Sequence, residues 1–276
     1  MRDKSGNFKS VKGNIYTRQW LPDEPPKAII LLVHGMAEHC GRYLHMGKFL
    51  TVNGYALCGL DLPGHGNSAG PRGYVDSFED FSTVVLQYQA MLAEKHPNVP
   101  VFLLGHSMGG LISSNLLLDH QAKFKGCILS AAAIRSPEQP AAFQMMVLKL
   151  LSIIAPKLGV IQLDADGVNS DPKRVEKYLN DPLNYIGKIS SRLVVGMFNT
   201  MLKVVARAPE ISLPMLLLHG ADDPMTSVDG SQILVDKCAS EDKQLIIYPG
   251  LRHEVLNESI NLEIFARVVV WLDQRC

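Results

Sequence analysis

The chain has 276 residues, of which 47% are hydrophobic and 20% charged, with 27 basic and 27 acidic side chains. This length is enough for one large α/β domain or two small ones with a well-buried core. A net charge of zero argues against nucleic acid, or any other polyanion, as a main partner.

The amino-terminal stretch MRDKSGNFKS (1–10) is polar and lacks the apolar core of a signal peptide. No run reaches the roughly 20 apolar residues that are needed to span a bilayer. The scattered cysteines, without C-x-x-C spacing, predict reduced thiols, so we expect a cytoplasmic protein that is not secreted and needs no metal or cofactor. The five cysteines are Cys40, Cys58, Cys127, Cys238 and Cys276.

The first predicted element is an antiparallel hairpin at the edge of a sheet. Residues 7–22 (NFKSVKGNIYTRQWLP) contain two alternating segments on either side of Gly13–Asn14, a dipeptide typical of tight hairpin turns.

Six short apolar runs follow, and each ends in glycine or small polar residues. They are apolar on both faces, as the strands of a buried parallel sheet are. Amphipathic stretches such as 78–96 lie between them, and this alternation predicts a doubly wound α/β sheet. The runs are KAIILLVHG (27–35), YALCGLDLPGHG (55–66), VFLLGHSMGG (101–110), KGCILSAAA (125–133), MLLLHGADD (215–223) and QLIIYPGLRH (244–253).

The fourth and fifth runs begin about 89 residues apart, far more than one crossover helix requires. We therefore expect a core of residues 1–133 and 210–276 and an inserted lid at 134–209. Such an insertion lies over the carboxyl ends of the strands, where open α/β sheets bind ligands. It begins with an apolar helical stretch, residues 141–160, that is interrupted by Pro156.

The run 101–110 carries a G-x-S-x-G motif in Gly105, Ser107 and Gly109. The serine falls on the turn between a predicted strand and a predicted helix, where a strained, close-packed backbone requires glycines and exposes the hydroxyl. This context predicts that Ser107 is a nucleophile. The helix that follows aims its positive end at the site.

A serine nucleophile needs a base and an acid that orients the base, and on this type of sheet they follow the serine as Asp or Glu and then His. Of the nine histidines, only His253 follows the acid and lies after a strand. Asp222 and Asp223, just after the fifth run, are both candidates for the acid. Two backbone amides must stabilise the oxyanion, and we expect them from Met36 and Met108.

Several motifs together resemble the monoacylglycerol lipases of the α/β-hydrolase fold, in one register from about residue 8 to the end of the chain. The resemblance implies a nucleophile at Ser107, an acid at Asp223, a base at His253 and the two oxyanion amides already named. Asp223 is preferred because the family's acid falls three residues after the glycine aligned with Gly220. The motifs are HGMAEHCGRY, DLPGHGNSAG, PVFLLGHSMGG, NDPLNYIG, LLLHGADDP and GLRHEVLNE. This chain departs from the mammalian members at Tyr185 and Thr226, where they carry cysteines.

The resemblance implies a monoacylglycerol as the lipid ester substrate, cleaved to a fatty acid and glycerol. We expect substrate contacts from Leu148 and Leu151 in the lid helix and from Tyr185, and transient contact of this helix with membrane surfaces. A lysophospholipase or a general carboxylesterase would use the same triad. A peptidase of this fold would need acids in the lid to bind the amine of its substrate, and the candidates are Asp164, Asp166 and Asp171. A protein that only binds a partner would need no catalytic triad.

Overall fold

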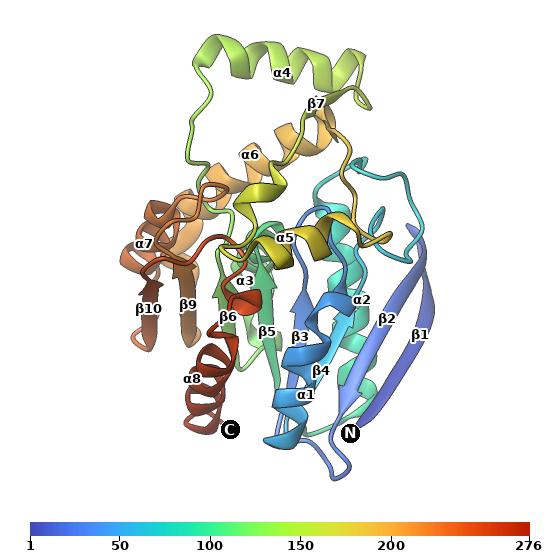
Figure 1. Ribbon diagram of the computed structural model, residues 1–276, viewed down its shortest axis with the longest axis vertical. Helices are drawn as coiled ribbons and strands as arrows, with labels where there is room; N and C mark the ends of the chain where they lie inside the picture. The colour runs from blue at the N-terminus through green and yellow to red at the C-terminus, as the bar shows by residue number, and fades with distance from the viewer.

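The computed structural model describes residues 1–276 and is built around one sheet of eight strands in the order β1-β2-β4-β3-β5-β6-β9-β10 (Figure 1). Strands β4, β3, β5, β6, β9 and β10, which are successive neighbours in this sheet, all run parallel. The predicted mostly parallel α/β sheet is therefore confirmed. The strands are β1 (Arg2–Ser10), β2 (Gly13–Leu21), β3 (Ile29–Val33), β4 (Ala56–Leu60), β5 (Val101–His106), β6 (Gly126–Ser130), β9 (Met215–Gly220) and β10 (Lys243–Tyr248).

Strands β1 and β2 form the predicted antiparallel hairpin at one edge of the sheet, but the predicted turn was wrong. Ser10 pairs with Gly13, so Val11 and Lys12 form the turn. Gly13 instead begins β2 with a φ of 100°, in the left-handed region that favours glycine.

The central strands are buried on both faces, as their continuous apolar runs predict. In β3, the side chains at 29, 31 and 33 enter one hydrophobic core, and those at 30 and 32 enter the other. The sheet is thereby packed between two hydrophobic cores, which keep the carboxyl ends of its strands in fixed positions.

Helices cover both faces of the sheet (Figure 1). Helices α1 (Leu44–Val52) and α8 (Asn261–Asp273) pack against one face, whereas α2 (Glu79–Lys95), α3 (Met108–His120) and α7 (Val228–Lys237) pack against the other. Short 3₁₀ helices are η1 (Cys40–Tyr43), η2 (Gln121–Lys123), η3 (Ala165–Gly167), η4 (Ala208–Glu210) and η5 (Val255–Asn257).

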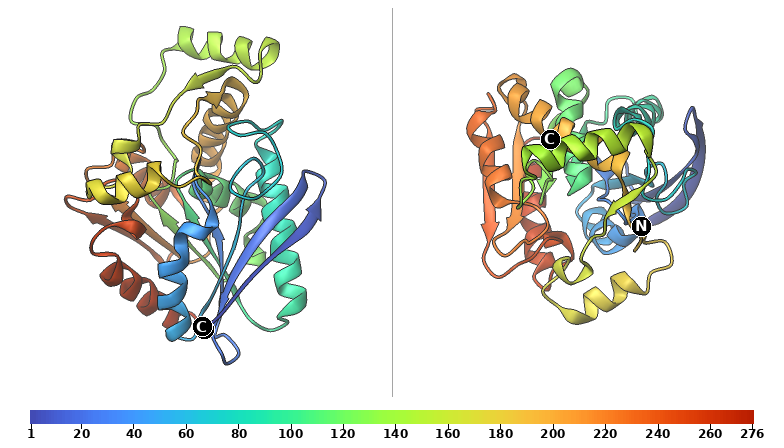
Figure 2. Two further views of the ribbon diagram at one scale, coloured as in Figure 1. Left: turned by 45° about the vertical axis from the view of Figure 1, so that its right-hand side comes forward. Right: turned by 90° about the horizontal axis from the view of Figure 1, so that it is seen from above.

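Residues 134–209 form a separate layer beyond the carboxyl ends of the strands, and Figure 2 shows α4 lying across the top of the molecule. The elements of this inserted segment are α4 (Ala142–Ile154), β7 (Gly159–Ile161), α5 (Pro172–Leu179), β8 (Ile189–Ser190) and α6 (Ser191–Arg207). Helix α4 ends two residues before Pro156 and packs on α6, which in turn packs on α3. None of the helices is both long and apolar enough to cross a membrane.

The turn from β5 into α3 is packed against the end of β3 without room for side chains. A Cβ atom on Gly109 would lie 2.0 Å from the carbonyl oxygen of Val33 and 2.4 Å from that of His34. A Cβ on Gly105 would lie 2.4 Å from the hydroxyl oxygen of Ser113. These contacts explain physically why the motif has glycines on both sides of its serine.

The substitution Gly109→Ala is expected to lower the free energy of unfolding by about 3 kcal/mol, because the contacted atoms are backbone oxygens that cannot move aside. Urea unfolding followed by circular dichroism measures this. Gly6→Ala is the matched control, since its added Cβ would be 3.6 Å from its nearest neighbour, the Thr17 hydroxyl oxygen. Equal stability losses in the two variants would contradict the expectation.

Candidate active site

Ser107 lies between the end of β5 and the first residue of α3, at a backbone φ of 53° and ψ of −120°. A non-glycine residue with positive φ is strained, and such strain is typical of functional turns. The surrounding chain holds the turn: the Ser107 amide donates to the Ser130 carbonyl at 2.9 Å, and the Ala133 amide donates to the Ser107 carbonyl at 3.0 Å.

His253 follows β10 and lies next to Asp223, which follows β9. The ring Nδ1 of His253 is 2.8 Å from Oδ2 of Asp223, and both side chains are almost fully buried. Asp222 is exposed, and it makes no side-chain hydrogen bond to a histidine. Of the two candidate acids, the structure therefore brings Asp223 to the imidazole.

The charges of this pair shift both pKa values. Burial favours the neutral His253 ring, but the nearby Asp223 carboxylate outweighs burial and raises the pKa of His253 above its ordinary value. Burial likewise favours a neutral Asp223, but His253 and the donors around the carboxylate hold the pKa of Asp223 far below its ordinary range. Asp223 is therefore an anion at any pH at which the protein works.

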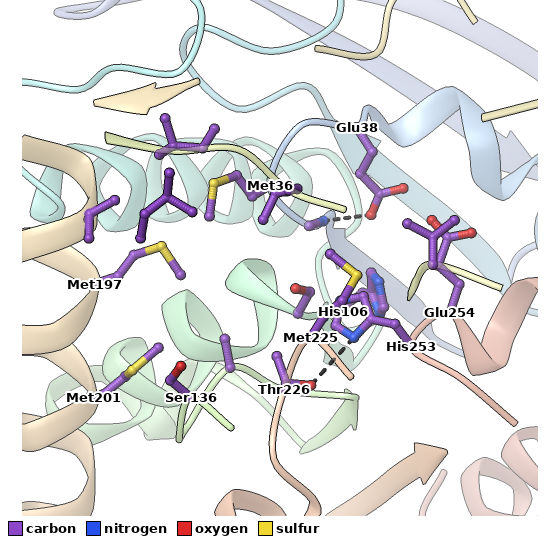
Figure 3. Close-up of a pocket in the computed structure, with 18 of the residues that line it drawn as sticks. Met36, Glu38, His106, Ser136, Met197, Met201, Met225, Thr226, His253 and Glu254 are labelled. Carbon is purple, nitrogen blue, oxygen red and sulfur yellow. Dashed lines mark hydrogen bonds between the residues drawn. The ribbon is translucent and has the colours of Figure 1, made fainter. Parts of the chain in front are cut away.

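Ser107 and His253 both line one cavity of about 170 Å³ beneath the inserted segment. The Ser107 hydroxyl makes no hydrogen bond to the His253 ring in this structure. Figure 3 shows His253, Met225 and Thr226 on one side of the pocket and Met197 and Met201, from α6, on the other. The remaining apolar lining comes mainly from the inserted segment: Ile161, Leu163, Val168, Tyr178, Ile189, Val194 and Phe198.

Met36 also lines the cavity, in the loop that follows β3. Its backbone amide makes no hydrogen bond within the protein, whereas the preceding Gly35 amide donates to Glu38 Oε1 at 2.7 Å. Ala37 takes a φ of 65°, which turns the loop sharply. Met108 follows Ser107 directly as the first residue of α3. The two amides predicted to stabilise an oxyanion thus belong to the residue after Ser107 and to a loop that lines the same cavity.

A buried ion network, not predicted from the sequence, lies behind this loop. Arg42 pairs with Glu38 at 2.8 Å and with both carboxylate oxygens of Glu254, one of them at 2.8 Å. Tyr43 donates its hydroxyl to Glu38 at 2.8 Å. Because Glu254 follows His253, this network ties the loop after β3 to the loop that carries the imidazole.

His106, the residue before Ser107, also lies at the site. Its ring lines the cavity and lies 4.8 Å from the His253 ring, centroid to centroid. Burial, and then the neighbouring His253, lower the pKa of His106 to about 4, so it is neutral and cannot compete with His253 for a proton.

The predicted substrate contacts are not brought to Ser107. Leu148, Leu151 and Tyr185 do not line its cavity. The two leucines are on α4, and α6 lies between α4 and the sheet. Leu148 lines an adjoining depression of about 540 Å³ between α4 and α6. Tyr185 has a structural role: its amide donates to the Ala37 carbonyl at 2.9 Å. No group of three or more His, Cys, Asp or Glu side chains is arranged so that it could hold a metal ion.

The chain is similar to known proteins over nearly its whole length. The family model described as serine aminopeptidase, S33, matches residues 24–260. A monoacylglycerol lipase of Mycolicibacterium smegmatis is 35% identical over 96% of this chain and 95% of its own length. The chain belongs to the monoacylglycerol lipase family of α/β-hydrolases.

Two further relatives extend this result. The monoglyceride lipase of Homo sapiens is 31% identical, covering 95% of this chain and 87% of its own. The crystal structure of the Paleococcus ferrophilus monoacylglycerol lipase superposes with a TM-score of 0.86 at 30% identity, covering 95% of this chain and 99% of that one. As a member of this family, the chain is a carboxylic ester hydrolase.

In this family member, Arg42→Met is expected to lower the free energy of unfolding by about 3–5 kcal/mol, because it leaves Glu38 and Glu254 buried without a counter-ion. Chemical denaturation at neutral pH measures the loss. The control is Arg207→Met, which breaks ion pairs with Asp119 and Glu210 on the surface and should leave the midpoint near that of the wild type. An Arg42 variant as stable as this control would contradict the expectation.

Proposed function

We propose that this chain hydrolyses monoacylglycerols to a free fatty acid and glycerol, with Ser107 as nucleophile, His253 as general base and Asp223 as the acid that orients the base. One observation carries the proposal. Ser107, on its strained turn, and His253, hydrogen-bonded to Asp223 at 2.8 Å, open into the same apolar cavity.

In the proposed reaction, the Ser107 hydroxyl oxygen attacks the ester carbonyl carbon, and its proton passes to Nε2 of His253. This transfer requires the hydroxyl to turn toward the ring, a contact that forms in many hydrolases only when substrate is bound. The tetrahedral oxyanion accepts hydrogen bonds from the amides of Met36 and Met108. Each such donor contributes roughly 3 kcal/mol to the stability of the transition state.

Collapse of this intermediate breaks the ester C–O bond, and the departing glycerol oxygen takes the proton from His253. Water then attacks the acyl-enzyme, gives a proton to His253, and releases the fatty acid as Ser107 recovers that proton. Throughout, Asp223 stays ionised and stabilises the imidazolium by accepting from Nδ1.

The residues on the two sides of the cavity support the proposal of an ester substrate with one polar and one apolar end. Glu38 and Glu254 lie near His253, and their carboxylates suit a hydroxyl-bearing alcohol such as glycerol (Figure 3). The opposite side is lined by Met197, Phe198 and Met201 of α6 and suits an acyl chain.

A long acyl chain needs more space than this cavity has. A cavity of about 150 Å³ holds a molecule of benzene's size, so 170 Å³ holds only part of a sixteen-carbon chain. The depression between α4 and α6 shares Ser136, Ile161 and Phe198 with the cavity and continues it toward Leu148. We assign the distal acyl carbons to this depression and a lid function to residues 134–209.

A peptidase of this fold is not favoured. The acids that would bind a substrate amine do not line the cavity. Asp164 accepts from the amide of Asp166 and caps η3, and Asp171 caps α5 by accepting from the amide of Lys173.

Helix α4 supports the proposed contact with membrane surfaces. Its outward side chains are large and apolar, with Phe143 69% exposed, Ile153 72% and Ile154 67%. Leu148 and Leu151 are half-buried toward α6, so the exposed face is made by other residues than those expected from the sequence. An exposed apolar patch of this kind marks an interaction site, and here we assign it to the lipid surface that holds the substrate, with the protein cytoplasmic and peripheral.

Wild-type protein is expected to release fatty acid from 1- and 2-monoacylglycerols faster than from diacylglycerol, lysophosphatidylcholine or short p-nitrophenyl esters. Ser107→Ala should abolish labelling by a fluorophosphonate probe, and Asp223→Asn should lower kcat by about 10⁴-fold because the imidazole loses its orienting carboxylate. Asp222→Asn is the matched control and should keep wild-type turnover. A preference for lysophosphatidylcholine would replace the proposed substrate with a lysophospholipid.

The double variant Leu150→Asp, Ile154→Asp is expected to float with liposomes several-fold less than wild type, because charges on α4 oppose insertion of its apolar face. The double variant Val52→Asp, Val270→Asp carries the same added charge on exposed valines of α1 and α8 and should float as wild type does. These two helices lie at the opposite end of the molecule from α4 (Figure 1). Equal flotation of both variants would reject a membrane role for α4.

A further inference from the structure

His219 is a buried histidine to which the proposed reaction gives no role. It lies near the end of β9 and is fully inaccessible to solvent. Its ring Nε2 is 3.1 Å from Oδ2 of Asp223 and 3.2 Å from the Thr226 carbonyl oxygen, and its Nδ1 is 2.7 Å from the Ser231 hydroxyl oxygen. His219 does not line the cavity, so it has no contact with a substrate there.

The partners of the ring determine where its proton lies. Nε2 faces the Asp223 carboxylate, the Thr226 carbonyl and, at 3.3 Å, the Thr226 hydroxyl oxygen. The first two can only accept, and the hydroxyl gives its one proton to Asp223 at 2.7 Å, so Nε2 carries a proton. Ser231, on α7, has no other side-chain hydrogen-bond partner and can donate its hydroxyl proton to Nδ1. A ring that carries its proton on Nε2 therefore satisfies these contacts of His219.

This ring is one of several donors to the same carboxylate. Oδ2 of Asp223 also accepts from His253 Nδ1 at 2.8 Å and from the Thr226 hydroxyl at 2.7 Å. Oδ1 accepts from the amides of Met225 at 2.7 Å and Thr226 at 3.1 Å. An ionised carboxylate has about four lone-pair sites, so these donors fully occupy Asp223 and prevent its rotation.

We propose that His219 is a positioning residue that acts through Asp223: it fixes Oδ2 toward His253 and shares the negative charge of that oxygen with it. The inference rests on the proposed function, in which Asp223 orients the base. Without the Nε2 donor of His219, the carboxylate would interact more strongly with a protonated His253. The base would then become neutral, and the enzyme active, only at higher pH.

The other groups that face His253 stay the same when His219 is replaced. A change in the pH profile is therefore attributable to the contact between His219 and Asp223. These groups are the Asp223 carboxylate itself, Glu38, Glu254, Arg42 behind the two glutamates, and His106.

The test compares three variants by the pH dependence of kcat and KM with a monoacylglycerol. His219→Phe should lower kcat about tenfold, leave KM within about twofold and move the acid limb of the kcat profile up by roughly half a pH unit. His219→Gln retains an N–H donor and should restore kcat to within about threefold of wild type with an unshifted profile. Ser231→Ala removes the partner of Nδ1 alone and should also leave the profile unshifted.

Two outcomes would overturn the proposal. In the first, the His219→Phe variant folds and has the kcat and the acid limb of the wild type. In the second, His219→Gln lowers kcat as much as His219→Phe does, and neither variant shifts the pH profile. If the Phe variant does not fold, ¹⁵N NMR of the wild-type protein decides. The His219 ring should be protonated on Nε2 at the pH of maximal activity, and protonation on Nδ1 alone would overturn the proposal. A wild-type protein inactive on all esters would reject the proposed function, whereas the NMR result would still report the contact of His219.

Discussion

The close approach of α3 to the end of β3 is the constraint on which the site depends. Gly109 touches the backbone of the neighbouring strand, and no other residue fits there. This contact forces the chain to turn within one residue after β5, and Ser107 takes a strained backbone conformation as a result. The free energy of that strained conformation is offset by the packing of the two hydrophobic cores on either side of the sheet.

The rest of the site is arranged around this fixed point by side chains from loops at the same edge of the sheet. Asp223 and His253 follow β9 and β10, which are parallel neighbours, so their loops meet without a long connection. Arg42 links two carboxylates that belong to different loops. The reactive groups are thus held by charge and hydrogen bonding on one side and by apolar packing of the inserted segment on the other.

Features that depend on local pattern could be predicted from the sequence. Continuous apolar runs predicted the buried parallel strands, and the glycines beside Ser107 predicted its turn, because both effects act over a few residues. The hairpin turn was misplaced because Gly13 serves as the first residue of β2, where the same positive φ is required.

Features that depend on distant packing could not be predicted. Arg42 and Glu254 are 212 positions apart, and no local pattern marks them as partners. The contacts of His219 and His106 likewise follow from how strands and loops stack. Tyr185 was expected to contact the substrate, but it does not line the cavity. Its backbone amide instead donates to the Ala37 carbonyl and holds that loop.

Helix α6 has a mechanical consequence for the cavity. It packs on α4 on one side and on α3 on the other, and its residues Met197, Phe198 and Met201 line the space beside Ser107. Because α6 is the only helix between α4 and the cavity, a movement of α4 would shift α6 and change the cavity wall without moving the sheet. The width of the cavity therefore depends on the position of α4, a helix that does not line it.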